Sequence, residues 1–219
     1  MRSTELLRSP EKVLMLMQEA VHECMDARGV DRPRLLREGS LLIIVSSEYT
    51  LDPSAPDAEV AVRAELTGLN LFFMEFTFAL TAAGGFPVGT ARSVWAVMDR
   101  DTRKAIPTDG VGLPRLGRPV PARVRLDGVL TEHRTFTPDE SFRDHNDHVN
   151  NAQYFRMLPL SGRAVTGMAV EYRREVRIGE AVDLAWSDAD GELQMRAFCG
   201  EKVCFDARVK TVNIPVHKG

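Results

Sequence analysis

The stretch from Pro10 to Val30, PEKVLMLMQEAVHECMDARGV, decides the fold class because it is a single helix set in front of a long run of strands. Apolar residues recur in it at the i, i+3, i+4, i+7 spacing of one helical face. These residues are Val13, Leu16, Met17, Ala20 and Cys24. Pro10 and Gly29 stand where a helix begins and ends. The stretch therefore predicts one amphipathic helix.

After this helix the chain takes on the composition of strands. Four segments, at 40–51, 58–66, 69–82 and 89–99, are rich in Val, Ile, Phe and Thr and are separated by turn residues. The letters AAGG at 82–85 predict a hairpin turn between the last two segments. A helix followed by several strands is not the alternating order of a parallel α/β sheet. We therefore predict an α+β fold with an antiparallel sheet.

The same order recurs in the second half of the chain. A stretch rich in proline and glycine follows residue 100, and after it come a strand, a short helical segment and four further strands. They lie at 130–137, 152–158, 165–176, 180–187, 191–199 and 202–214. The final strands of the two halves share letters, with TARSVWAV from Thr90 and DARVKTVN from Asp206. This recurrence indicates an internal repeat.

We predict a tandem fold in which each of two units wraps a curved antiparallel sheet around one central helix. The first unit covers residues 1–100, a linker covers 101–127, and the second unit covers 128–219. Either unit alone would expose sheet edges and too much apolar surface for its size. Pairing the two units covers both.

The composition, with 44% hydrophobic and 27% charged residues, is typical of a soluble globular protein. The formal net charge of -3 gives no support for binding to nucleic acid or to an anionic membrane. No apolar run reaches the roughly 18 residues that cross a bilayer, and residues 1–20 lack the pattern of a signal peptide. We therefore expect no membrane insertion.

The 3 cysteines are an odd and sparse set that fits a reducing, cytoplasmic location better than a disulfide scaffold.

A polar motif, RDHNDHVNNAQY at 143–154, opens the short helical segment of the second unit. In an extended segment, residues at i, i+2 and i+4 share one face, and here they are Asp144, Asn146 and His148. Either Asn150 or Asn151 is a good N-cap for the helix that follows. The unpaired N–H groups and the positive end of that helix would then point toward the same side chains.

The motif resembles the Asp-x-Asn-x-His-Val-Asn-Asn signature of acyl-acyl carrier protein thioesterases, which are tandem, or double, hotdog-fold enzymes. Tyr154 also stands in the expected place. The letters EYRREV at 171–176 are similar to the Tyr-Arg-Arg-Glu strand of that family, and SVWAVMDRDTRKAIP at 93–107 is similar to the end of its first hotdog. The short match QEA at 18–20 lies in the first helix.

The chain departs from the family pattern in three places. Val176 stands where the family usually has a cysteine, which argues against a cysteine nucleophile. Pro159 and Gly162 shorten the second central helix. The first hotdog leaves little room for a strand before its helix.

The resemblance implies a hydrolase that releases a fatty or polyketide-type acyl chain from acyl carrier protein or coenzyme A. It implies no metal and no organic cofactor. Whether the protein forms a homodimer stays an open question. The implied catalytic residues are Asp144, Asn146, His148 and Glu175, and the implied substrate-binding residues are Asn150, Asn151 and Tyr154. Glu175 or Asp144 would activate water as a general base. Alternatively, Asp144 would attack first and form an acyl-enzyme anhydride.

Other interpretations of the same residues stay open. The motif could be a solvated loop with a helix cap, or a metal site in which His145 and His148 join Asp144 or Asp147. Glu175 could be a surface ion-pair residue, since Arg173, Arg174 and Arg177 surround it in sequence. At the level of function, the alternatives are a hotdog dehydratase, isomerase or cyclase that acts on a carrier-bound chain, and a non-catalytic acyl-binding protein.

Overall fold

The computed structural model describes residues 2–3, 9–53, 60–144, 148–160 and 163–213. Its first long element is the helix α1 (Pro10–Asp26), which begins at the predicted proline and ends shortly before Gly29. All five residues of the predicted apolar face are buried. The prediction of this amphipathic helix is therefore confirmed.

Four antiparallel strands follow α1 and make one half of the sheet. They are β2 (Ser40–Leu51), β3 (Val60–Leu69), β4 (Phe73–Ala82) and β5 (Pro87–Asp99), arranged in the order β3-β4-β5-β2. The predicted hairpin turn between the last two is the short 3-10 helix η1 (Ala83–Gly85). Two short strands flank this half, because β1 (Arg2–Ser3) pairs with β3 and β6 (Ala105–Ile106) pairs with β5.

The second half of the sheet has the mirrored order β8-β11-β10-β9-β7. Its strands are β7 (Glu132–Phe136), β8 (Arg163–Tyr172), β9 (Val182–Ala189), β10 (Glu192–Cys199) and β11 (Lys202–Asn213). In this order β8 corresponds to β2 and β11 corresponds to β5. The letters shared by the two halves therefore lie on equivalent strands.

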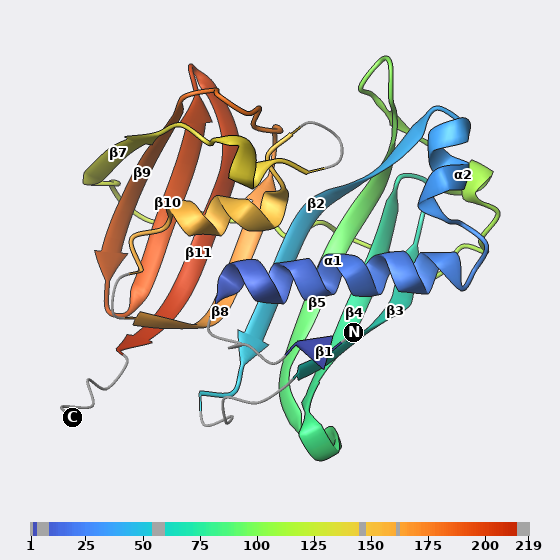
Figure 1. Cartoon of the computed structure of the whole chain (residues 1–219), viewed down its shortest axis with the longest axis horizontal. Helices are drawn as coiled ribbons and strands as arrows, with labels where there is room; N and C mark the ends of the chain where they lie inside the picture. Colours follow the sequence, from blue (N-terminus) through green and yellow to red (C-terminus); the bar gives the residue numbers. More distant parts are fainter. Residues whose placement is uncertain (1, 4–8, 54–59, 145–147, 161–162, 214–219) are drawn as a thin grey trace.

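The two halves join where β2 pairs with β8, and we call this junction the seam. It runs from the pair Ser46 and Glu171 to the pair Thr50 and Gly167. The seam makes the strands one continuous sheet, and Figure 1 shows α1 and the orange helix of the second half together in front of it. This is the predicted tandem arrangement of helix and curved sheet.

The passage between the halves crosses the outer face of the sheet, opposite α1. It contains the short helix η2 (Thr108–Val111). The backbone N–H of Ala122 donates to Ser46 Oγ at 3.0 Å, and Arg123 contacts Glu171 at 2.5 Å. The backbone N–H of Val124 donates to the same buried carboxylate. These bonds hold the passage against the seam. The division of the chain into two units joined by a linker at 101–127 stays a prediction.

The short helices partly follow the predictions and partly add to them. The helical segment of the second half is η4 (Asn151–Met157), a 3-10 helix of 7 residues, which agrees with the shortening expected from Pro159. The small helices α2 (Arg32–Arg37) and η3 (Glu140–Phe142) were not predicted.

Among the described helices, none combines the length and apolar character needed to span a lipid bilayer.

Candidate active site

Asp144 and His148, the described residues of the predicted extended segment, lie close together and not at the separation that an extended segment requires. The backbone N–H of Asp144 donates to the carbonyl of His148 at 2.8 Å, and the N–H of His148 donates to Asp144 Oδ1 at 3.1 Å. Five extended residues would hold these groups more than about ten ångströms apart, so the extended interpretation is wrong. Asn146, a predicted catalytic residue, lies outside the described residues, as do His145 and Asp147.

The second part of the motif caps η4, as predicted for Asn150. Its Oδ1 accepts the backbone N–H of Ala152 at 2.8 Å, and its carbonyl accepts that of Gln153 at 2.8 Å. These two N–H groups are therefore not among the unpaired groups that were predicted at the start of this helix. Asn151 is the first residue of η4 and is half-buried.

Glu175 lies in an irregular segment after β8 and not on a strand, because β8 ends at Tyr172. The backbone N–H groups of Arg173 and Arg174 both donate to the carbonyl of Cys204, at 2.8 and 3.1 Å. On the other side of Glu175, the carbonyl of Val176 accepts the backbone N–H of Val149 at 2.9 Å. The segment is thus anchored to β11 on one side and to the motif on the other.

Tyr154 provides a further anchor for this segment. Its hydroxyl oxygen accepts the backbone N–H of Val176 at 3.0 Å, and its ring stacks on Phe205 with centroids 5.0 Å apart. The side chain is 0% exposed, and burial raises the pKa of its hydroxyl. In this structure Tyr154 therefore positions the backbone next to Glu175 from inside the core. Its contact with substrate stays a prediction.

The carboxylate of Glu175 meets one group from each half of the chain. His148 Nε2 lies 3.3 Å from Oε1, and the guanidinium of Arg103 binds Oε2. The side chains of His148 and Glu175 are 23% and 32% exposed, so their pair lies on an accessible rim. The neighbouring arginines in the sequence form ion pairs with other carboxylates. Arg174 contacts Glu180 at 2.7 Å, and Arg173 contacts Asp206 at 2.9 Å. Glu175 does form an ion pair, but its partner comes from the first half.

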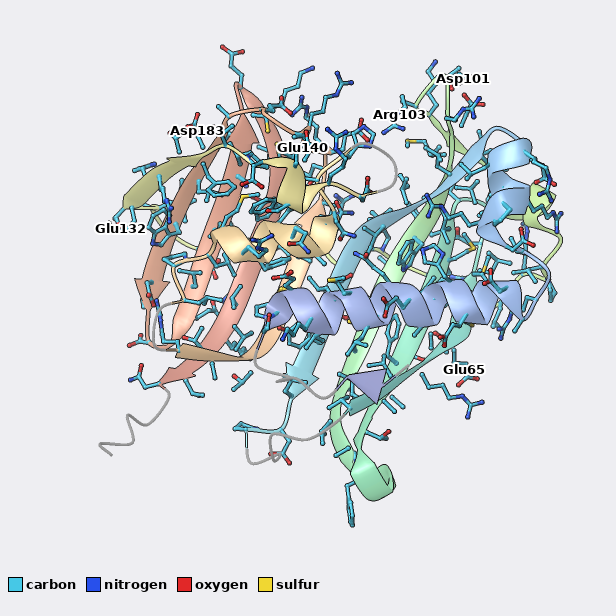
Figure 2. All side chains as sticks on the ribbon, in the orientation of Figure 1. Glu65, Asp101, Arg103, Glu132, Glu140 and Asp183 are labelled. Atoms are coloured by element: carbon cyan, nitrogen blue, oxygen red, sulfur yellow. The ribbon has the colours of Figure 1, made fainter. Side chains whose placement is uncertain are left out.

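Arg103 is the residue that sequence reasoning missed. It lies on the turn after β5, where Asp99 Oδ1 accepts both the N–H and the hydroxyl of Thr102 at 2.7 Å. Its own N–H donates to the carbonyl of Asp99 at 3.0 Å, and its φ of 58° is in the left-handed region that side chains rarely adopt. Figure 2 shows Arg103 on this turn, on the side toward the second half. The stretch 93–107, which carried part of the resemblance, includes this residue.

The metal interpretation finds no support among the residues that the structure describes. Within them, no three His, Cys, Asp or Glu side chains form a group that could hold a metal ion. His145 and Asp147, which that interpretation needs, are not among them. A metal-free site therefore stays a prediction.

The fold is similar to that of several solved thioesterases. The 12:0-ACP thioesterase from Umbellularia californica superposes with a TM-score of 0.77 at 16% identity, covering 98% of this chain and 95% of that chain. An acyl-ACP thioesterase from Bacteroides thetaiotaomicron gives 0.75 at 18% identity, covering 92% and 89%. A protein described as an oleoyl thioesterase from Lactobacillus plantarum gives 0.74 at 19% identity, covering 94% and 88%.

A MaoC-like dehydratase from Phytophthora capsici is also similar, with a TM-score of 0.55 at 12% identity over 85% of this chain and 75% of that chain. No family model and no curated protein sequence matches the chain. At these identities the likenesses establish the fold. The predicted double hotdog fold is therefore confirmed.

Proposed function

We propose that this protein hydrolyses acyl thioesters carried by acyl carrier protein or coenzyme A. The observation that carries the proposal is the partly exposed Glu175 carboxylate, which meets His148 on the rim of the second hotdog. The resemblance of both sequence motifs to those of acyl-acyl carrier protein thioesterases supports the same reaction. Similar structures include proteins described as acyl-ACP and oleoyl thioesterases.

In the proposed reaction Glu175 is the general base and His148 orients the reacting groups. Water attacks the thioester carbonyl carbon and passes its proton to Glu175, after which the C–S bond breaks and the thiolate takes up the proton. His148 would supply a hydrogen bond to the carbonyl oxygen as negative charge develops there. The same role is proposed for Asn146 on the motif alone. The reaction needs no metal or organic cofactor.

Arg103 acts as a positioning residue in this reaction because it touches Glu175 and not the substrate. A guanidinium beside a carboxylate favours its ionised form, which is the form that accepts a proton. The contact also fixes the direction in which Glu175 points. Arg103, on the turn between β5 and β6, thereby completes a site whose other proposed members belong to the second half of the chain.

The geometry favours Glu175 over Asp144 as the base. Asp144 Oδ1 accepts the backbone N–H of His148, so this carboxylate closes the turn that presents the imidazole. Asp144→Asn should accordingly leave measurable turnover, since an amide oxygen accepts the same bond. Near-complete loss in that variant would instead indicate that Asp144 attacks the thioester.

The decisive experiment measures free thiol released from a panel of acyl-carrier, acyl-CoA and acyl-pantetheine thioesters. His148→Ala and Glu175→Gln should each lower kcat by roughly 10²–10⁴-fold, with unchanged circular dichroism. The double variant should cost little more than the worse single variant, because the two residues act as one unit. Glu132→Gln, an exposed carboxylate change on β7, is the matched control.

Three outcomes would contradict the proposal. Near-normal turnover by Glu175→Gln would leave Glu175 as an ion-pair residue only. An acyl group that is altered but still attached to its carrier would indicate dehydratase, isomerase or cyclase chemistry. Saturable binding without turnover would indicate an acyl-binding protein.

A further inference from the structure

The inner face of the seam carries three hydroxyl groups that the proposed reaction does not use. Ser47 and Tyr49 are alternate residues of β2, and Tyr172 is the last residue of β8. Ser47 pairs across the seam with Val170, two residues before Tyr172. Because alternate residues of a strand point to the same face, the three side chains share the face that α1 covers.

All three hydroxyls are buried, and none has a hydrogen-bond partner among the described residues. Ser47 is 1% exposed and Tyr49 is 3% exposed. Burial raises the pKa of Tyr49 and Tyr172, so both phenols stay neutral and keep a proton to donate. Each of the three can therefore both donate and accept one further hydrogen bond.

The hydroxyls follow the seam away from the Glu175 segment. The rings of Tyr172 and Tyr154 have centroids 6.1 Å apart, and Tyr154 in turn holds the backbone of Val176, next to Glu175. The residues of one strand face are about 7 Å apart. Tyr172 thus lies closest to the proposed site, and Ser47 and Tyr49 lie progressively farther along β2.

Buried hydroxyls without partners are costly. Each one lowers the folding equilibrium constant roughly tenfold relative to a paired hydroxyl. Buried polar groups in folded proteins are nearly always satisfied by protein, water or ligand. Three on one face beside the site indicate that water or a polar group of a ligand occupies this position.

We propose that the inner face of the seam, formed by Ser47, Tyr49 and Tyr172, is a subsite for an oxygen substituent on the acyl chain. The preferred substrate is then a hydroxy- or keto-acyl thioester and not an unsubstituted one. The inference rests on the proposed thioester hydrolysis and deepens it. A site built to hydrogen-bond a substrate oxygen discriminates strongly against the analogue that lacks it, because the groups of the site are then left unpaired.

The test compares pantetheine thioesters of octanoate with those bearing a hydroxyl or keto group at the third, fifth or seventh carbon. The wild type should hydrolyse at least one oxygenated thioester with a kcat/KM roughly tenfold or more above that of octanoate. Tyr49→Phe, Tyr172→Phe and Ser47→Ala should reduce this preference, and at least one of them should reduce it roughly tenfold. Their effect on the octanoate thioester should be small.

Thr67→Val is the matched control, because Thr67 Oγ1 is another buried hydroxyl with no partner among the described residues. Thr67 lies on β3, three strands from β2 in the sheet, which is about 14 Å. It should leave the preference unchanged. A wild type that hydrolyses all the thioesters equally, or seam variants that slow all of them alike, would overturn the subsite and show that water alone fills this position.

Calorimetric binding of the free acids separates this inference from the proposed function. If no thioester is hydrolysed but the oxygenated acids bind about tenfold more tightly than octanoate, and the Phe variants lose that difference, the subsite stands and the hydrolase proposal fails. Hydrolysis without any oxygen preference would support the hydrolase and refute the subsite. Neither hydrolysis nor selective binding would refute both.

Discussion

Replacing Arg103 with methionine tests whether the turn between β5 and β6 completes the site in the second half of the chain. The change keeps an unbranched side chain of moderate length but removes the positive charge that contacts the Glu175 carboxylate. Arg103→Met should therefore move the acidic limb of the kcat/KM profile to higher pH, since the base must be ionised and has lost its cationic partner.

The size of the shift follows from the contact. Two unit charges about 4 Å apart interact by about 4 kcal/mol at an effective dielectric constant near 20. The Arg103 and Glu175 side chains are 37% and 32% exposed, so solvent screens much of this energy. Exposed ion pairs are typically worth about 1 kcal/mol or less, and the partial burial here places the interaction at about 1–2 kcal/mol. At about 1.36 kcal/mol per pKa unit, the acidic limb should move by about one pH unit.

The assay is thiol release from a pantetheine thioester between about pH 3 and 8, a range that extends below the ordinary glutamate pKa of about 4.3. The concentration of folded enzyme is matched by circular dichroism. Arg103→Lys should restore most of the position of the limb, because it returns the charge without the forked geometry. Within the part of the chain that the structure describes, His148 is the other titratable group that contacts Glu175, so His148→Gln is measured in parallel to assign the limb to the carboxylate. Arg100→Met is the control on the same turn, since Arg100 contacts Asp101 and is 54% exposed. An acidic limb that stays in place in Arg103→Met would refute the positioning role.

Three further predictions concern buried or partly buried side chains. Tyr154→Phe should lower the free energy of unfolding by about 1–3 kcal/mol in urea titrations, because the buried N–H of Val176 loses its acceptor; an unchanged midpoint would contradict this. Burial lowers the pKa of His22 from 6.5, so the unfolded chain binds more protons, and stability should fall as pH decreases below about 6.5. That pH dependence should weaken in His22→Gln, and an identical dependence in both proteins would refute the assignment. Alkylation under native conditions should leave activity intact, since Cys199 and Cys204 are buried. This should hold even though the hydrogen bond between the two thiols lowers the pKa of Cys204 to about 7. Substrate-protectable inactivation at either cysteine would overturn this.

Sequence patterns over a few residues predicted those helices, strands and caps that depend on interactions between neighbouring residues. The period of α1, the strand segments and the cap at Asn150 depend on residues within a few positions of one another, and the sequence displays them. The order of elements was enough to predict two units that each combine a helix with an antiparallel sheet; the mirrored strand order appears only in the structure. The exact end of β8 was not predictable, because Arg173 and Arg174 leave the strand for bonds to the carbonyl of Cys204 on another strand.

The candidate site shows the same division between local and distant information. His148 and Glu175 were identified by their motifs, and the structure places their side chains in contact. The turn at Asp144 was missed because a single bond from a side chain to the backbone overrides the spacing rule for extended segments. Arg103 was missed because it meets Glu175 only after the two hotdogs pack together. A contact between distant segments leaves no periodic signal in the chain.

The seam also affects the order in which the two halves fold during synthesis. Its partners, such as Ser46 and Glu171, are far apart in the sequence, so the seam is among the slowest contacts to form. At roughly 5–20 residues per second, the ribosome completes the first hotdog several seconds before β8 emerges. During that interval β2 has no partner on one side, and the Pro-rich passage that donates to Ser46 is the first segment able to shield it. Substitutions in this passage should therefore lower the yield of soluble protein during synthesis more than they lower the stability of the finished fold.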